Sequence, residues 1–144
     1  MREGSAEYLK RLRLWSSPEV VEVEEFRLPQ DPSPAQVAAC VEREGERILQ
    51  RIPKGAVTVA LCIEGKELSS EGLAAFLARS AGEGNGSFCF VIGGSHGLSE
   101  AVKRAADLRL SMSPMTFPHQ LARVLLLEQL YRALSINANA KYHK

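Results

Sequence analysis

Long apolar stretches are absent from this chain of 144 residues. No apolar run reaches the roughly 20 residues that a membrane-spanning helix requires. The first ten residues are rich in charge and lack the apolar core of a secretory signal peptide. These absences predict a cytoplasmic protein with no membrane partner. The length fits one domain built around one hydrophobic core.

Cysteine is scarce, and the three cysteines, Cys40, Cys62 and Cys89, have no paired spacing. This pattern predicts reduced thiols in a cytosolic protein rather than a disulfide framework or a metal site. Cys62 and Cys89 also lie inside apolar runs, which predicts that they are buried. We therefore expect no metal and no catalytic thiol.

A strong net charge is missing as well. The formal net charge is +1, so the chain lacks the overall basic character of a typical nucleic-acid-binding protein. From His119 to the end, however, the sequence has one acidic residue, Glu128, and more basic residues: Arg123, Arg132, Lys141 and Lys144. This local excess suits contacts with phosphates, but a solvated basic tail has the same composition. Charge alone therefore assigns no partner.

The spacing of apolar residues predicts alternating helices and strands. Ser33-Pro34 with Gln36 has the pattern of a capping box, and two continuous apolar runs suit strands buried on both faces of a parallel sheet. In chain order we expect a helix at 3–14, a half-exposed strand at 19–26, a helix from Pro34 to Arg51, a strand at 57–63, a loop at 64–66, a helix after Ser69 or Ser70, a strand at 88–92, a helix from Ser99 to Asp107, a short strand at 108–112 and a helix from His119 to Ile136. This order predicts a single α/β domain over residues 1–144, with a mostly parallel sheet and helices on both faces.

The last helix is apolar on most of its circumference, from Leu121 to Leu134. Such a helix has to be covered on more than one side. In a domain of this size a partner subunit is the simplest cover, so we expect an oligomer.

The turn after the second buried strand, Gly93-Gly94-Ser95-His96-Gly97, allows three interpretations. Glycines beyond the carboxyl end of a parallel strand let the backbone approach a nucleoside-like ligand. A plain strand-to-helix turn would use the same glycines. The segment also matches Gly-x-Ser-x-Gly, the nucleophile elbow of serine hydrolases, with Asp107 and His119 following in the order acid, histidine. The hydrolase is the weakest of the three, because the chain lacks the strands that normally precede such an elbow.

Several motifs, taken together and in order, resemble one known family. They lie at residues 44–49, 61–66, 90–98, 115–121, 123–133 and 142–144. Over nearly its whole length the sequence is similar to the ribosomal RNA large-subunit methyltransferase H family, the pseudouridine N3-methyltransferases of the SPOUT class. Several motifs in the right order are far more specific than any one of them.

The resemblance implies an α/β domain whose C-terminal segment is threaded into a trefoil knot, and a homodimer that binds S-adenosyl-L-methionine in that knot. Pattern reasoning would not propose a knot, since knots are rare. The residues that the resemblance assigns to the cofactor are Leu61, Gly93, Met112, Ser113, Pro114, Met115, Thr116 and Phe117. An apolar, proline-stiffened loop and a glycine turn suit adenine, which needs an apolar slot with backbone hydrogen-bond partners.

The reaction implied is rRNA modification, the transfer of a methyl group to N3 of a pseudouridine in 23S RNA, within the ribosome or the large subunit. N3 carries a proton, so a base should lie near the methyl group. We assign this role to His143, with Tyr142 stacking on or hydrogen-bonding the target, although a C-terminal Tyr-His by itself is more often a plain tail. Arg123, Arg132 and Lys144 are the candidates for contacts with RNA, and an intersubunit ion pair with Glu128 is an alternative for Arg123.

A binding module that keeps the cofactor pocket without transferring a methyl group would have the same motifs. His119 follows Pro118 at a helix start, which favours a cap or a structural hydrogen bond. The family also usually begins with an apolar strand before the helix that opens here at Arg2, and we expect its absence to affect the sheet more than the cofactor site.

Overall fold

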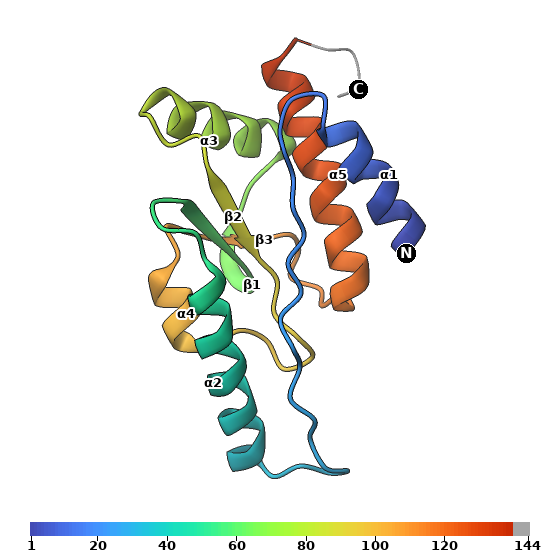
Figure 1. The fold of residues 1–144 in the computed structure, drawn as a ribbon, viewed down its shortest axis with the longest axis vertical. Helices are drawn as coiled ribbons and strands as arrows, with labels where there is room; N and C mark the ends of the chain where they lie inside the picture. Colours follow the sequence, from blue (N-terminus) through green and yellow to red (C-terminus); the bar gives the residue numbers. More distant parts are fainter. Residues whose placement is uncertain (140–144) are drawn as a thin grey trace.

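The computed structural model describes residues 1–139, and its ribbon is shown in Figure 1. The elements are α1 (Arg2–Leu12), α2 (Pro34–Arg51), β1 (Val57–Glu67), α3 (Ser70–Gly82), β2 (Phe88–Val91), α4 (Glu100–Ala105), β3 (Leu108–Ser111) and α5 (His119–Asn137). The predicted α/β class is confirmed, and so are all five helices. Within residues 1–139 no helix combines the length and apolar character needed to cross a bilayer.

The sheet has three parallel strands in the order β2-β1-β3. In the register of the central strand, Ala60 lies opposite Val91 of β2, and Leu61 lies opposite Leu110 of β3. The continuous apolar run at 57–61 is explained by this position, because a central parallel strand is buried on both faces.

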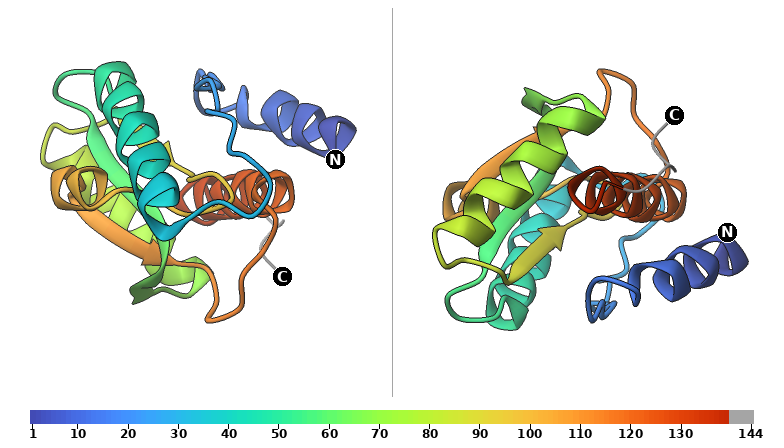
Figure 2. Two further views of the ribbon diagram at one scale, coloured as in Figure 1. Left: turned by 90° about the horizontal axis from the view of Figure 1, so that it is seen from below. Right: turned by 90° about the horizontal axis from the view of Figure 1, so that it is seen from above.

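Helices cover both faces of the sheet, as Figure 2 shows from two directions. Neighbouring side chains of a strand point to opposite faces. Val59 accordingly packs into a cluster with residues of α3 and α5, whereas Ala60 packs into a second cluster with Leu98 and Val102 beside α2. Both residues are fully buried, and the predicted helices on both faces are confirmed.

The apolar circumference of α5 is covered largely within the chain. None of the side chains from Leu121 to Ile136 is exposed. On the α1 side, Trp15, just beyond the end of that helix, packs on Tyr131 with 5.3 Å between ring centroids. On the α3 side, the side-chain amide of Asn137 donates to the Ala74 carbonyl at 3.0 Å. Most of these side chains are half-buried, so α1 and α3 cover part of the helix, and the expected oligomer stays a prediction.

The strand predicted at 19–26 is wrong. Residues 16–29 form an extended segment that runs past α5 toward the start of α2, and no strand within residues 1–139 pairs with it (Figure 1). Its glutamates form side-chain contacts instead: Arg123 Nη1 donates to Glu22 at 3.2 Å, and Arg47 Nη1 donates to Glu24 at 2.6 Å. Alternation of valine and glutamate predicts two different faces, but it cannot supply the neighbouring strand that a ladder needs.

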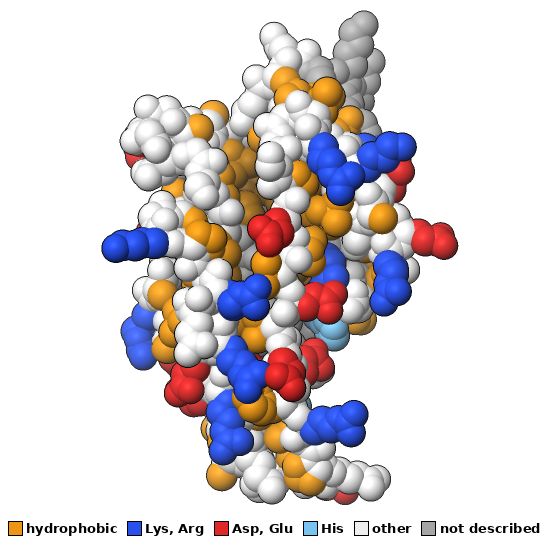
Figure 3. Space-filling view, viewed as in Figure 1, with side chains coloured by type: hydrophobic (Ala, Val, Ile, Leu, Met, Phe, Trp, Pro, Cys, Tyr) orange, Lys and Arg blue, Asp and Glu red, His pale blue; other side chains and the backbone are white. Residues whose placement is uncertain are grey.

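Acidic and basic side chains are interspersed on the face that carries the extended segment, as the space-filling view in Figure 3 shows. This mixture agrees with the ion pairs just described, and it leaves no large surface of one sign on that face. The local basic excess predicted from the sequence is thus partly neutralised.

The loop expected at 64–66 is part of β1. The strand continues to Glu67, but its register with β3 is irregular, since Leu110 lies opposite both Leu61 and Lys66. Here Gly65 crosses the backbone of β3 so closely that a β-carbon would lie 2.8 Å from the carbonyl carbon and oxygen of Arg109. Only glycine fits this crossing.

We therefore expect Gly65→Ala to lower the free energy of unfolding by about 1–3 kcal/mol, the usual cost of forcing an extra methyl group into a packed site. The matched control is Gly82→Ala at the end of α3, where a β-carbon would meet nothing within 4 Å. Urea titration of both variants measures the difference. Equal stabilities would show that β1 and β3 can separate at no cost.

Candidate cofactor and substrate site

The residues assigned to the cofactor meet at the carboxyl edge of the sheet. Leu61 ends the regular part of β1, Gly93 follows β2, and the loop 112–117 follows β3. Because all three strands are parallel, their carboxyl ends lie at one edge. Ligands of open α/β sheets bind beyond that edge. The tertiary structure thus brings together three segments that are far apart in the sequence.

The glycine turn at this edge is tightly folded. The Gly97 amide donates to the Gly94 carbonyl at 3.1 Å, and Gly97 has a φ of 84°, which favours glycine. A β-carbon on Gly93 would lie 2.8 Å from the Gly97 carbonyl carbon. The need for glycine at position 93 therefore comes from the packing of the turn on itself, and the exposed part of the turn is residues 95–97.

The helix after this turn is seated against α2. Ser99 caps α4 by accepting a hydrogen bond from the Val102 amide at 3.2 Å, as predicted. A β-carbon on Gly45 of α2 would lie 2.8 Å from the Ser99 β-carbon, so α2 and α4 touch at this point. The glycine at position 45 permits the contact that fixes the turn.

The loop 112–117 is held by its own serines and keeps apolar side chains exposed. Ser111 Oγ donates to the Ser113 carbonyl at 3.1 Å, and Ser113 Oγ accepts from the Met115 amide at 3.0 Å. Met115 is 72% exposed, and Ile63, on the irregular part of β1, is 50% exposed. Large exposed apolar side chains of this kind are available for contact with a ligand at this edge.

Two glutamates beside the glycine turn were not assigned from the sequence. A β-carbon on Gly94 would lie 3.5 Å from Glu44 Oε1 and 3.8 Å from Glu25 Oε1. Glu44 Oε2 accepts a hydrogen bond from the Phe26 amide at 3.3 Å, which ties the extended segment to α2. The motif at 44–49 contained Glu44, but nothing in the pattern placed it next to residue 94.

His119 does not cap α5, because the N-cap is Pro118 and no side-chain cap bond forms. Its Nε2 lies 4.0 Å from Glu25 Oε1 instead. The same nitrogen lies 3.4 Å from Gln120 Nε2, within hydrogen-bonding distance. Of the two predicted roles, the cap is wrong, and the contacts of His119 agree with a structural hydrogen bond.

The serine hydrolase interpretation fails on topology. The Asp107 carboxylate accepts a hydrogen bond from the Thr58 amide at 2.8 Å, which places Asp107 beside the start of β1. Ser95 follows the end of β2, at the opposite edge of the parallel sheet. The acid is therefore engaged with the backbone far from the serine, and the three residues do not form a triad.

The three cysteines are free, but the predicted burial of Cys62 and Cys89 is wrong: both are half-buried, and Cys40 is the buried one. Burial raises the pKa of the Cys62 and Cys89 thiols, which makes their reactive thiolate forms rarer. Across residues 1–139 no group of three or more His, Cys, Asp or Glu side chains is gathered as a metal site would require.

The predicted RNA-binding arginines both have acidic neighbours. Arg123 pairs with Glu22 rather than with Glu128, and the pair lies within the chain. Glu128 instead binds Arg132 of the next helical turn, through Nε at 3.0 Å and through Nη2. Tyr142, His143 and Lys144 lie outside the described residues.

Known proteins match this chain over its whole length. The profile of a family described as "Predicted SPOUT methyltransferase" matches residues 1–143. The chain belongs to the SPOUT methyltransferase family. Proteins named "Ribosomal RNA large subunit methyltransferase H" are 46% identical in Carboxydothermus hydrogenoformans, 49% in Bifidobacterium animalis subsp. lactis and 44% in Clostridioides difficile. In each case all of this chain and 91% of the relative are covered.

Membership of the SPOUT methyltransferase family agrees with the edge geometry and makes a nucleophilic role for Ser95 unnecessary. We expect a fluorophosphonate probe for active-site serines to leave the protein unlabelled, because Asp107 is bound to the Thr58 amide and cannot orient a histidine beside Ser95. Gel fluorescence after incubation measures the labelling. Labelling that disappears in Ser95→Ala would restore the hydrolase interpretation.

Proposed function

We propose that this protein transfers the methyl group of S-adenosyl-L-methionine to N3 of a pseudouridine in large-subunit ribosomal RNA. The observation that carries the proposal is the meeting of Leu61, Gly93 and the 112–117 loop at one carboxyl edge in a SPOUT chain. The printed names of its relatives, at 44–49% identity, support ribosomal RNA as the substrate.

The residues at this edge fit the proposed cofactor. Leu61, Met115 and Phe117 supply apolar surface for adenine, and the open backbone of the glycine turn supplies amide and carbonyl groups. Pro114 stiffens the loop, so less conformational freedom is lost when a ligand binds. The cofactor supplies a methyl group activated by a sulfonium centre, whose positive charge favours nearby carboxylates such as Glu25 and Glu44.

The proposed reaction is a direct displacement. N3 of the target attacks the methyl carbon, the new nitrogen–carbon bond forms as the sulfur–carbon bond breaks, and the N3 proton leaves to a base. We assign the base to His143, because an imidazole with an ordinary pKa near 6.5 accepts protons around neutral pH. Tyr142 is proposed to stack on or hydrogen-bond the target base, which has to leave its stack to react.

Arg123 and Arg132 remain candidates for phosphate contacts together with Lys144. A guanidinium has five N–H donors, so an ion pair with one carboxylate leaves others available. The glutamate partners hold the two side chains in place on α5. We further propose the trefoil knot, the homodimer and the cytoplasmic location that the family resemblance implies.

The first test separates an enzyme from a cofactor-binding module. We expect S-adenosyl-L-methionine to bind in calorimetry, and tritiated methyl groups to appear in 23S RNA when ribosomes lacking the modification are added. Binding without incorporation would favour the module, and the absence of both signals would contradict the proposal.

A second test addresses the division of labour between residues. His143→Ala should lower the rate of methylation by about 10²–10⁴-fold, the usual contribution of a general base, and leave the Kd for the cofactor nearly unchanged. An equal loss of rate and of cofactor affinity in His143→Ala would refute the assignment.

A further inference from the structure

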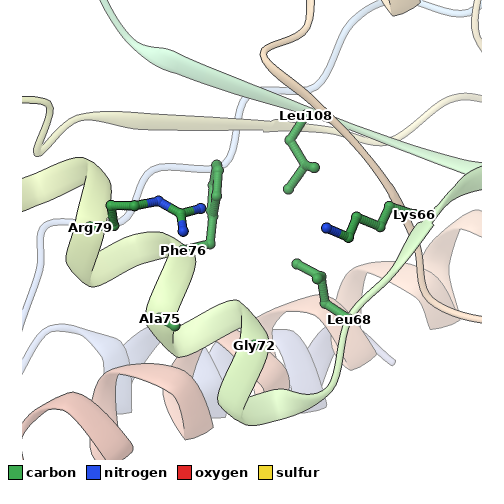
Figure 4. A pocket seen from close by; sticks show the side chains of 7 residues that line it. All are labelled: Lys66, Leu68, Gly72, Ala75, Phe76, Arg79 and Leu108. Carbon is green, nitrogen blue, oxygen red and sulfur yellow. The ribbon is translucent and has the colours of Figure 1, made fainter.

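A pocket of about 250 Å³ lies between α3 and the neighbouring parts of β1 and β3, apart from the predicted cofactor residues. Figure 4 shows it from close by: the side chain of Lys66 points into it from β1, and Arg79 of α3 lies on the opposite side, next to Phe76. The remaining lining is apolar or small: Leu68, Gly72, Ala75, Phe76 and Leu108.

The charged side chains that line this pocket are both positive. Lys66 and Arg79 are its only charged lining residues, and both are exposed. Neither takes part in an ion pair with another residue of the described range 1–139. An anionic group is the complementary ligand.

The size of the pocket indicates what carries the anion. Pockets that enclose a whole small molecule usually have about 300–1,000 Å³, and this one is smaller. Its apolar side, formed by Leu68, Phe76 and Leu108, suits the face of a base or a sugar next to a phosphate. A nucleic-acid strand that inserts one nucleotide, while the rest of the strand stays outside the pocket, fits both the small volume and the apolar wall.

The pocket is close to the candidate site along the sheet. Lys66 lies opposite Leu110 in the β1–β3 register, and Leu110 comes two residues before the loop 112–117. An RNA strand that presents a nucleotide at the carboxyl edge can therefore continue past Lys66. The ion-paired arginines Arg123 and Arg132 lie on α5, so this pocket adds a separate point of contact.

We propose that the pocket formed by Lys66, Arg79 and Phe76 binds a phosphate and the adjacent base of the ribosomal RNA that flanks the methylated nucleotide. This inference rests on the proposed function, because it takes ribosomal RNA as the substrate. The two side chains neutralise the phosphate, and the apolar wall favours a nucleotide that is not stacked in a duplex.

The test compares Lys66→Ala/Arg79→Ala with a control pair, Lys54→Ala/Arg104→Ala, which removes two exposed cations from the turn before β1 and from α4. Co-sedimentation with large subunits lacking the modification measures affinity at several salt concentrations. We expect the pocket variant to bind about tenfold more weakly, with a salt slope smaller by roughly 0.7 for one lost phosphate contact. The control should bind like the wild type, and Lys66→Arg/Arg79→Lys should retain most of the affinity.

Several results would overturn the proposal. The first is an unchanged affinity of Lys66→Ala/Arg79→Ala for large subunits. The second is an equal loss of that affinity in Lys54→Ala/Arg104→Ala. The third is a loss of cofactor affinity in the pocket variant, measured by calorimetry, that matches its loss of affinity for large subunits. A failure of the proposed methyl transfer gives a different result from a failure of the pocket assignment. Wild-type protein that binds the large subunit through this pocket but incorporates no methyl group would leave the pocket assigned and the methyl transfer refuted.

Discussion

The candidate site depends on one short stretch of backbone in β1, where Val59 and Ala60 pair with β2 on one side and with β3 on the other, and Leu61 continues the pairing with β3. Both pairings are parallel, so the chain leaves all three strands at the same edge. The glycine turn and the 112–117 loop are brought to Leu61 by that geometry alone. The same residues divide the core, since Val59 and Ala60 face opposite layers of helices.

Three glycines let neighbouring segments approach more closely than any other residue would allow. Gly45 brings α2 against the cap of α4, Gly65 lets β1 cross β3, and Gly93 closes the turn after β2. Each position lacks room for a β-carbon. These glycines therefore act through packing between backbones, and together they hold the carboxyl edge in shape without occupying it with side chains.

On the surface, charged side chains hold the extended segment against the helices. The extended segment at 16–29 has no neighbouring strand within residues 1–139, and glutamates along it contact α2 and α5. The same segment carries Glu25 toward the glycine turn, where Glu44 of α2 also lies. A stretch without regular structure thus contributes negative charge next to the proposed position of a sulfonium cation.

The sequence by itself determined the helices, the parallel strands and the family, because apolar periodicity, capping residues such as Ser33 and Ser99, and ordered motifs are local properties of the chain. Tertiary structure decided the rest. The segment at 19–26 has strand-like alternation but no paired strand within residues 1–139, α1 and α3 cover part of the apolar α5, and Asp107 binds Thr58 far from Ser95. Only the tertiary structure places two glutamates beside the glycine turn and two cations at one pocket: Glu25 and Glu44, and Lys66 and Arg79. Pairing, burial and charge proximity are relations between segments, and no local pattern specifies them.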